Sequence, residues 1–224
     1  MKFEETEVWG FEHAIRGMRN PKESWNKSDS STDACVNDIC EECEYERFGV
    51  CELLLGDNDL SLMRQLIKAG SEHRKFLRQI FVSVDITAPL YWWKEFDTYK
   101  VGTTANSCST MHKLASTPIT IDCFKMTDFE NVKIDMTIKG FWEEYLIPTL
   151  EQLRLKYLET KDKRYWKELI RLLPESWLQK RTVTMNYENV LNMYQQRKYH
   201  KLTEWSIDFC YWCESLPYFK ELEE

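Results

Sequence analysis

The sequence lacks a long apolar run, since no stretch approaches the roughly 18 apolar residues that a membrane-spanning helix needs. The first ten residues, MKFEETEVWG, lack the basic and apolar regions of a secretory signal. The chain also lacks an excess of positive charge, because its net charge is −7. We therefore expect a cytoplasmic protein with no membrane partner, and the charge argues against a nucleic acid as main partner. A local basic pocket for a mononucleotide is compatible with this charge balance.

An internal repeat and a linker between domains are absent as well. A chain of 224 residues with 43% apolar content can bury one substantial core, so we expect a single domain. Aromatic residues are abundant, at 14% with nine Trp. Cores and subunit interfaces both use such side chains, and core packing is the favoured explanation.

Eight cysteines occur without a secretory signal, which predicts reduced thiols instead of a disulfide framework. Four of them lie in one acidic segment, at Cys35, Cys40, Cys43 and Cys51. Thiolates at short spacings can complete a tetrahedral zinc site, but the irregular spacing favours free thiols. We expect no metal site, with zinc as the minor alternative, and a polar, cysteine-rich insertion over about residues 20–52. Cys210 and Cys213, on an aromatic helix face, are expected to be packing residues.

Hydrophobic periodicity predicts several helices and two strands. An apolar stripe at helical spacing marks a helix between Asp57 and Gly70. Alternating apolar residues predict strands over Ile80–Ile86 and Val132–Ile138, and Pro89 suits the first turn of the next helix. Further helices are expected over Phe141–Leu158, Tyr165–Leu172 and Tyr187–Ser215, the last as one long helix or a broken pair. The fold class is therefore α/β or α+β.

The most informative segment is Ile86–His112, ITAPLYWWKEFDTYKVGTTANSCSTMH. The predicted strand ends in Ile-Thr-Ala-Pro and leads into a Trp-rich stretch, a polar turn and a run of small residues. This order resembles the signature region of the flavin-dependent thymidylate synthases. In that family an Ile-x-Ala-Pro strand end feeds a helix with Arg-Gln and Arg-His-Arg, followed by Ser-x-Asn-Glu-x-Ser-x-Arg-Tyr. The two frames fit with one inserted residue.

Two further segments carry the same resemblance. His73 stands near the family's Gly-His motif, upstream of the strand. Towards the C-terminus, Asn186, Asn192 and Arg197 have the spacing of two Asn residues and an Arg that help the family to hold flavin and pyrimidine nucleotide. The resemblance covers about residues 60–112 and 170–205.

The resemblance implies a small, largely antiparallel sheet flanked by helices, with FAD as cofactor and a pyrimidine nucleotide as ligand. It also implies a homotetramer with sites between subunits, and a methyltransferase-like, reductive one-carbon transfer. By position, the expected catalytic residues are His112, Arg197 and Ser109. The expected cofactor-binding residues are His73, Lys100, Asn106, Asn186 and Asn192. We expect these side chains, His73 apart, to converge on one pocket walled by Trp92 or Trp93.

The charged residues of the family signature are changed in this chain. Lys94-Glu95 replaces Arg-Gln, Thr98-Tyr99-Lys100 replaces Arg-His-Arg, and Met111-His112 replaces Arg-Tyr. Near the C-terminus, Glu188 stands where the family has an arginine. A planar guanidinium binds phosphate bidentately, which these side chains cannot do. Losing several contacts of about 1.5–3 kcal/mol each weakens binding of dUMP or FAD by orders of magnitude. Orthodox thymidylate synthesis is therefore not expected.

Most candidate residues also have a purely structural explanation. Asn106 can cap a helix or hold a turn. Ser109 has no partnered base evident in the sequence, so it is not interpreted as an activated nucleophile. A lone histidine such as His112 or His73 is more often structural than catalytic. Ion pairs are expected between the acidic Glu95 and Asp97 and the basic Lys94 and Lys100.

Three functions remain open, and the least favoured of them, a small zinc-dependent binding module, rests only on the four clustered cysteines. The first is a flavin-dependent enzyme, or a binder of a pyrimidine nucleotide, with altered specificity. The second is a non-catalytic descendant of the fold that serves as an interaction protein. A phage or another mobile element would suit so divergent a member of the family.

Overall fold

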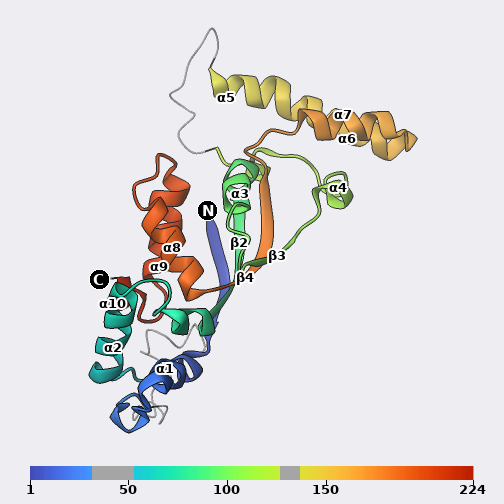
Figure 1. Ribbon diagram of the computed structural model, residues 1–224. Helices are drawn as coiled ribbons and strands as arrows, with labels where there is room; N and C mark the ends of the chain where they lie inside the picture. The colour runs from blue at the N-terminus through green and yellow to red at the C-terminus, as the bar shows by residue number, and fades with distance from the viewer. Residues whose placement is uncertain (32–52, 127–136, 224) are drawn as a thin grey trace, which may run out of the picture. The chain divides into compact units, whose positions relative to one another are not determined.

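The computed structural model describes residues 1–31, 53–126 and 137–223 (Figure 1). Their contacts group into two compact units. Unit 1 contains Met1–Ile86, Tyr99–Ala105 and Thr182–Glu224, and unit 2 contains Thr87–Thr98 and Asn106–Arg181. The four cysteines of the zinc alternative and most of the second predicted strand lie outside the described residues. The single domain and the insertion over residues 20–52 stay predictions.

The sheet has four antiparallel strands in the order β1-β2-β4-β3. They are β1 (Lys2–Trp9), β2 (Phe81–Pro89), β3 (Thr104–Ser107) and β4 (Leu178–Asn186). The predicted small antiparallel sheet flanked by helices is confirmed, and so is the first predicted strand. Its alternation works as expected, because Val82, Val84 and Ile86 are fully buried on one face of β2.

The structure differs from the predicted elements at the end of the second predicted strand. Ile138 begins the helix α5 (Ile138–Phe141) and is not part of a strand. The reason is local, because the Thr137 hydroxyl oxygen accepts a hydrogen bond of 3.1 Å from the backbone N–H of Gly140. Such a cap satisfies an N–H group that would otherwise have no partner in the first helical turn.

Unit 1 packs its helices around an aromatic core. The helices are α1 (Phe11–Arg19), α2 (Asp57–Lys68), α8 (Tyr187–Arg197), α9 (Cys210–Glu214) and α10 (Phe219–Glu223). α8 ends at Arg197, and helical structure resumes at Glu204 with a π-helix over Glu204–Phe209 that continues into α9. The broken pair expected over Tyr187–Ser215 is therefore confirmed. The ring of Tyr187 meets that of Phe11 edge-on at 5.5 Å, and its hydroxyl donates to the Pro217 carbonyl at 2.7 Å. Cys210 and Cys213 are buried packing residues, as predicted.

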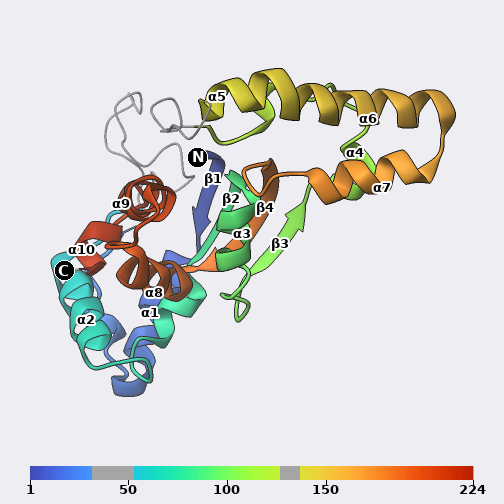
Figure 2. The same cartoon turned by 90° about the horizontal axis from the view of Figure 1, so that it is seen from above.

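Unit 2 consists mainly of short helices and a helical hairpin. The elements are α3 (Leu90–Phe96), α4 (Thr110–Lys113), α5, a π-helix over Trp142–Leu146, α6 (Ile147–Thr160) and α7 (Lys163–Leu172). The helices predicted after Pro89, over Phe141–Leu158 and over Tyr165–Leu172 are confirmed. Figure 2 shows α6 and α7 side by side. Lys161 turns the chain between them with a left-handed φ of 59°, and the Asp162 carboxylate caps α7.

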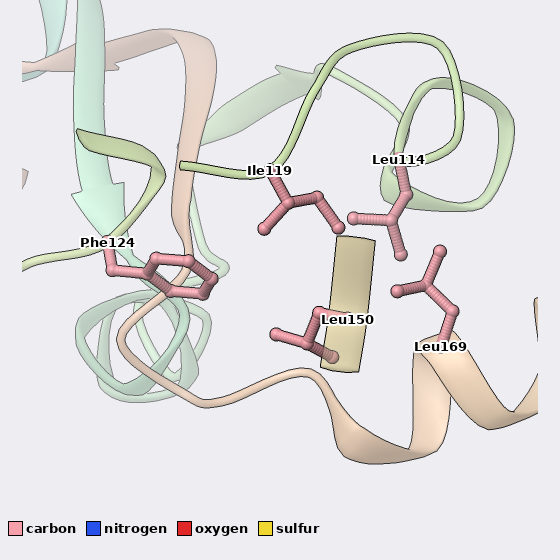
Figure 3. Close-up of a cluster of buried hydrophobic side chains, with 5 residues drawn as sticks. All are labelled: Leu114, Ile119, Phe124, Leu150 and Leu169. Atoms are coloured by element: carbon pink, nitrogen blue, oxygen red, sulfur yellow. The ribbon is translucent and has the colours of Figure 1, made fainter. Parts of the chain in front are cut away.

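A small apolar core holds unit 2 together. Its fully enclosed members are Leu114, Ile119, Phe124, Leu150 and Leu169 (Figure 3). They come from α6, from α7 and from the segment between α4 and α5, so this core joins the hairpin to the rest of the unit. No helix within the described residues is long and apolar enough to cross a membrane.

Candidate functional site

Asn186 occupies the N-terminus of α8 in unit 1. Its side-chain oxygen accepts a hydrogen bond of 3.0 Å from the backbone N–H of Asn189. In return, the side-chain oxygen of Asn189 accepts from the backbone N–H of Asn186 at 3.4 Å, which completes a capping box. Asn186, a predicted cofactor-binding residue, therefore has a structural role at the start of α8.

The turn around Gly102 lies directly on this helix end. Asn189 donates from its side-chain nitrogen to the Val101 carbonyl at 2.7 Å. Gly102 has a left-handed φ of 76°, and a Cβ atom there would lie 2.8 Å from the side-chain oxygen of Asn189. A glycine is needed for both reasons, the backbone conformation and the close approach.

Glu188 gathers two arginines beside the first turn of α8. Its side chain is only 12% exposed and accepts hydrogen bonds from Arg78 and, at 3.2 Å, from the Nε of Arg74. Arg74 also donates from Nη2 to the side-chain oxygen of Asn192 at 2.8 Å. Asn192, another predicted cofactor-binding residue, is thus engaged with a side chain that the sequence analysis did not single out. The position at which the family has an arginine carries a carboxylate that holds two other arginines.

The surroundings of Glu188 keep it ionised. Burial alone raises the pKa of its carboxyl, but hydrogen bonding and charge from Arg78, and then from Arg74, bring this pKa below its ordinary value. Two guanidinium groups around one carboxylate leave the cluster with a net positive charge. The cluster is therefore a cationic patch whose charge Glu188 partly cancels.

Arg197 ends α8 among aromatic side chains. Its Nε donates to the Tyr99 hydroxyl at 2.9 Å, and its guanidinium carbon lies 4.7 Å above the ring of the buried Trp205. The Tyr99 hydroxyl in turn donates to the side-chain oxygen of Gln196 at 3.1 Å. A guanidinium stacked on an aromatic ring keeps its charge and presents its N–H donors at the edge of the plane. Arg197 is thus positioned by aromatic contacts.

The other two predicted residues of unit 1 are exposed. Lys100 follows Tyr99 in the turn that precedes β3. His73 lies between α2 and the 3₁₀ helix Lys75–Gln79, and lines a cavity of about 770 Å³ together with residues of α1 and α2. His73 therefore borders a space large enough for a small ligand.

Ser109 and His112 form a hydrogen-bonded pair in unit 2. The Ser109 Oγ lies 2.8 Å from the His112 Nδ1, and it also accepts from the backbone N–H of His112 at 3.3 Å. The prediction that Ser109 has no partnered base is wrong, because one turn of α4 brings its side chain to that of His112. Such a pair can pass a proton from hydroxyl to imidazole. Asn106 lies exposed in β3 and does not cap a helix.

Arg181 organises the other polar contacts of unit 2. Its Nη1 pairs with the Asp97 carboxylate at 2.7 Å, and its guanidinium carbon lies 4.2 Å above the ring of Trp93. Lys94 pairs with Glu175 at 2.6 Å. The predicted partners of Asp97 and Lys94 are therefore wrong, because α3 ends at Phe96 and its acidic and basic groups meet residues close to or within β4.

Trp92 and Trp93 are core residues. They are 0% and 1% exposed, and together with Phe96 they form a cluster of rings with centroids 4.9 to 5.3 Å apart. The Trp93 indole also donates to the Gln179 carbonyl at 2.9 Å. Core packing, the favoured explanation for the aromatic excess, is confirmed for this pair.

The seven residues predicted to converge are divided between the two units. Unit 1 holds Lys100, Asn186, Asn192 and Arg197, and unit 2 holds Asn106, Ser109 and His112. Their convergence on one pocket stays a prediction. Within the described ranges, no group of three or more His, Cys, Asp or Glu side chains could hold a metal ion.

Comparison with known proteins places the fold. No family model and no curated protein matches the sequence. Among solved structures, two of the flavin-dependent thymidylate synthase ThyX from Helicobacter pylori, both with FAD and dUMP, match over 100% of this chain and 97% of theirs. Their TM-scores are 0.65 and 0.66. The fold is that of ThyX. Identities of only 15% and 16% mean that this likeness concerns the fold alone.

Three arginines with carboxylate partners were not predicted from the sequence as site residues. Arg74, Arg78 and Arg181 each contact a carboxylate, yet none of them belongs to a motif quoted from the sequence. One signal was available, because Glu188 reverses the charge that the family carries at that position. A reversed charge predicts that opposite charges lie nearby, which is what the Arg74 and Arg78 contacts show.

Proposed function

We propose that this chain binds a pyrimidine nucleotide, or a related small molecule, with a specificity that differs from that of ThyX. The observation that carries this proposal is the ion cluster of Glu188 with Arg74 and Arg78 in a chain whose whole length has the ThyX fold. A carboxylate repels a ligand phosphate, and it also occupies the guanidinium groups that would attract one. Orthodox thymidylate synthesis is therefore not part of the proposal.

FAD is the cofactor of the proposal, because both solved structures named above contain it. The residues that fit it are Arg197, held in place by Tyr99 and Trp205, and the exposed Lys100. These cations would bind the phosphates, while the amides of Asn186 and Asn192 lie along the same helix. When bound, a flavin supplies carbon and hydride transfer. Glu188 opposes the phosphates, so we expect weak binding.

The proton-handling role falls to His112 and Ser109. In the observed pair, the His112 Nδ1 is close enough to receive the proton of the Ser109 hydroxyl. An imidazole can both accept and donate a proton, which suits an acid or base that acts on a bound pyrimidine. Convergence of this pair with Lys100, Asn106 and the residues of α8 is part of the proposal.

A non-catalytic interaction protein is the second candidate. The same cluster favours it, because Glu188 already holds the guanidinium groups of Arg74 and Arg78 that would otherwise attract an anionic ligand. Both candidates include a homotetramer, as the family resemblance implies. The cytoplasmic location and the phage or mobile-element origin stay predictions.

A ligand screen separates the two candidates. The purified protein is examined for flavin absorbance, and its melting temperature is measured with FAD, FMN, dUMP, dCMP and the corresponding nucleosides. Binding predicts a yellow protein or a rise in melting temperature with at least one pyrimidine ligand. A colourless protein that responds to none of these compounds would contradict the first candidate and favour the non-catalytic one.

Arg197→Ala is the most informative variant in this screen. It removes the retained cation of α8, so it should abolish stabilisation by the ligand that the screen identifies. Lys198→Ala is the matched control, because Lys198 is the next residue and pairs with Glu223 at 3.0 Å. Equal ligand responses in the two variants would contradict the assignment of Arg197.

A further inference from the structure

The hydroxyl of Ser109 is oriented by His112. Its Oγ accepts the backbone N–H of His112 at 3.3 Å, which uses one of the two lone pairs of the oxygen. The same Oγ lies 2.8 Å from the His112 Nδ1 and has no further hydrogen-bond partner among the residues that the structure describes. When the imidazole carries its proton on Nε2, the hydroxyl hydrogen therefore points at the free lone pair of Nδ1.

The segment that carries Ser109 is tied to β4 on both sides of this residue. Gln179 donates from Nε2 to the Cys108 carbonyl at 2.9 Å and to the Thr110 hydroxyl at 3.2 Å. The backbone N–H of Cys108 donates to the Lys180 carbonyl, also at 2.9 Å. These bonds fix the backbone before and after Ser109, so its hydroxyl is held in position before any reactant arrives.

The pair is also accessible to a reactant. His112 is exposed, Ser109 is half-buried, and the hydrogen bond between them lies at the surface of unit 2. Ser116 provides a contrast within the same unit, because it is exposed but its hydroxyl donates to the Lys113 carbonyl at 2.7 Å. A peptide carbonyl is too weak a base to take up that proton, whereas an imidazole can do so.

We propose that Ser109 is an activated nucleophile that takes an acyl group from a carboxylic ester, with His112 as general base. The Ser109 Oγ attacks the ester carbonyl carbon while its proton moves to the His112 Nδ1. The bond from that carbon to the alcohol oxygen then breaks, and the departing alcohol takes the proton from Nδ1. Water releases the acyl group as a carboxylic acid and restores the hydroxyl. A hydroxyl within hydrogen-bond reach of a base is the arrangement that this chemistry requires.

An alkyl fluorophosphonate tests this proposal in the full-length protein. Attack of the Ser109 Oγ on phosphorus forms an O–P bond and displaces fluoride, while the hydroxyl proton passes through His112 to solvent. The product is a stable phosphonate ester, which peptide mapping by mass spectrometry assigns to one residue. We expect the adduct on Ser109 and none on Ser116.

His112→Gln identifies the base. Glutamine can still form a hydrogen bond with Ser109, but it cannot take up the proton. Since a general base contributes about a hundredfold or more, the rate of adduct formation should fall by at least about that factor. His200→Gln is the matched control, because the Nδ1 of His200 accepts the backbone N–H of Leu202 at 3.2 Å and lies in unit 1. It should leave the rate unchanged.

Hydrolysis of p-nitrophenyl acetate gives the second measurement. Ser109→Ala should abolish the release of p-nitrophenol above the level of the buffer and of the remaining surface groups. Three results would overturn the proposal. They are the absence of an adduct on Ser109, equal labelling of Ser109 and Ser116, and an unchanged rate of labelling in His112→Gln. Because these probes contain neither a pyrimidine nor a flavin, this proposal and the proposed function can fail independently.

Discussion

Among the charged positions at which this chain departs from the family that it resembles, Glu188 has the most extensive contacts with other charged residues. Glu188 stands where the family has an arginine, and it holds Arg74 and Arg78. Reversing one charge in a partly buried site changes which neighbours are stabilised, because each buried charge needs a partner of the opposite sign. The consequence is an internal ion cluster beside α8, the helix on which the family resemblance predicts ligand-binding residues.

Glu188→Gln should destabilise the protein by about 1–2 kcal/mol near pH 7, because the glutamine leaves two arginines without their carboxylate. The pH dependence is the sharper test. The folded-state pKa of Glu188 is lowered, so its stabilisation is complete above the ordinary pKa of about 4.3 and is lost as the pH falls through the folded-state value. Urea unfolding between pH 7 and pH 3 should show a smaller loss of stability in the variant.

Glu72→Gln is the control for this measurement. Glu72 is 82% exposed and lies 3.9 Å from Lys75, so its replacement should change the stability by less than about 0.5 kcal/mol. Identical pH profiles for Glu188→Gln and the unaltered protein would show that the cluster does not contribute to stability.

Polar partners were the part of the site that the sequence predicted least well. Asp97 and Lys94 were predicted to form ion pairs with charged residues of their own helical segment. Instead, Asp97 pairs with Arg181 and Lys94 pairs with Glu175. Spacing predicts contacts within one helix, but it cannot predict which side chains of a distant strand arrive beside it. Asn186, in contrast, was offered as a ligand-binding residue on the basis of spacing and is a helix cap.

At the scale of elements, a strand can be predicted from the sequence where one of its faces is apolar and buried. β2 has one fully buried face, which the alternating Val82, Val84 and Ile86 predict in the sequence. In β4, the first residue Leu178 is followed by the polar Gln179, Lys180 and Arg181, and the buried apolar alternation starts only at Val183. Polar side chains on a strand are positioned by tertiary contacts, so they leave no period in the sequence.

Comparing Gly102 with Gly70 separates two costs of replacing a glycine by alanine, which are the strain of the backbone conformation and the clash of the added Cβ atom. Gly102→Ala places a Cβ atom 2.8 Å from the Asn189 side chain in a residue with φ of 76°. Gly70→Ala has a φ of 103° and no atom within 4 Å of its Cβ. Gly70→Ala should therefore cost only the backbone strain, about 1–2 kcal/mol, and Gly102→Ala should cost more. Equal losses in thermal unfolding would contradict the close approach to α8.

Asn186→Ala tests the cap of the same helix. The alanine leaves the backbone N–H of Asn189 without its acceptor and should cost about 0.5–2 kcal/mol in chemical unfolding. Asn186→Asp keeps an acceptor at the cap and places a negative charge at the helix N-terminus, which is favourable, so it should retain most of the stability. A similar loss in both variants would show that the side-chain amide matters for another reason.

For the whole molecule, the division into two units has a measurable consequence. Leu150→Ala opens a cavity in the core of unit 2, where Leu150 is fully buried, and should cost about 2–5 kcal/mol. Hydrogen exchange followed by mass spectrometry should then show earlier exchange in α6 and α7, while α8 keeps its protection. If α8 loses protection equally, the two units unfold as one cooperative structure.

The last prediction concerns the mass of the protein in solution. Large aromatic side chains remain exposed in unit 1, among them Tyr199 at 89% and Tyr211 at 76%. Such groups often mark an interface, and the family resemblance implies a homotetramer. Light scattering at micromolar concentration should therefore give four times the chain mass of 27.0 kDa. If these tyrosines take part, the double variant Tyr199→Ser and Tyr211→Ser should lower that mass, whereas the exposed Lys220→Ser should not. A mass of one chain for the unaltered protein would exclude any ligand pocket shared between subunits.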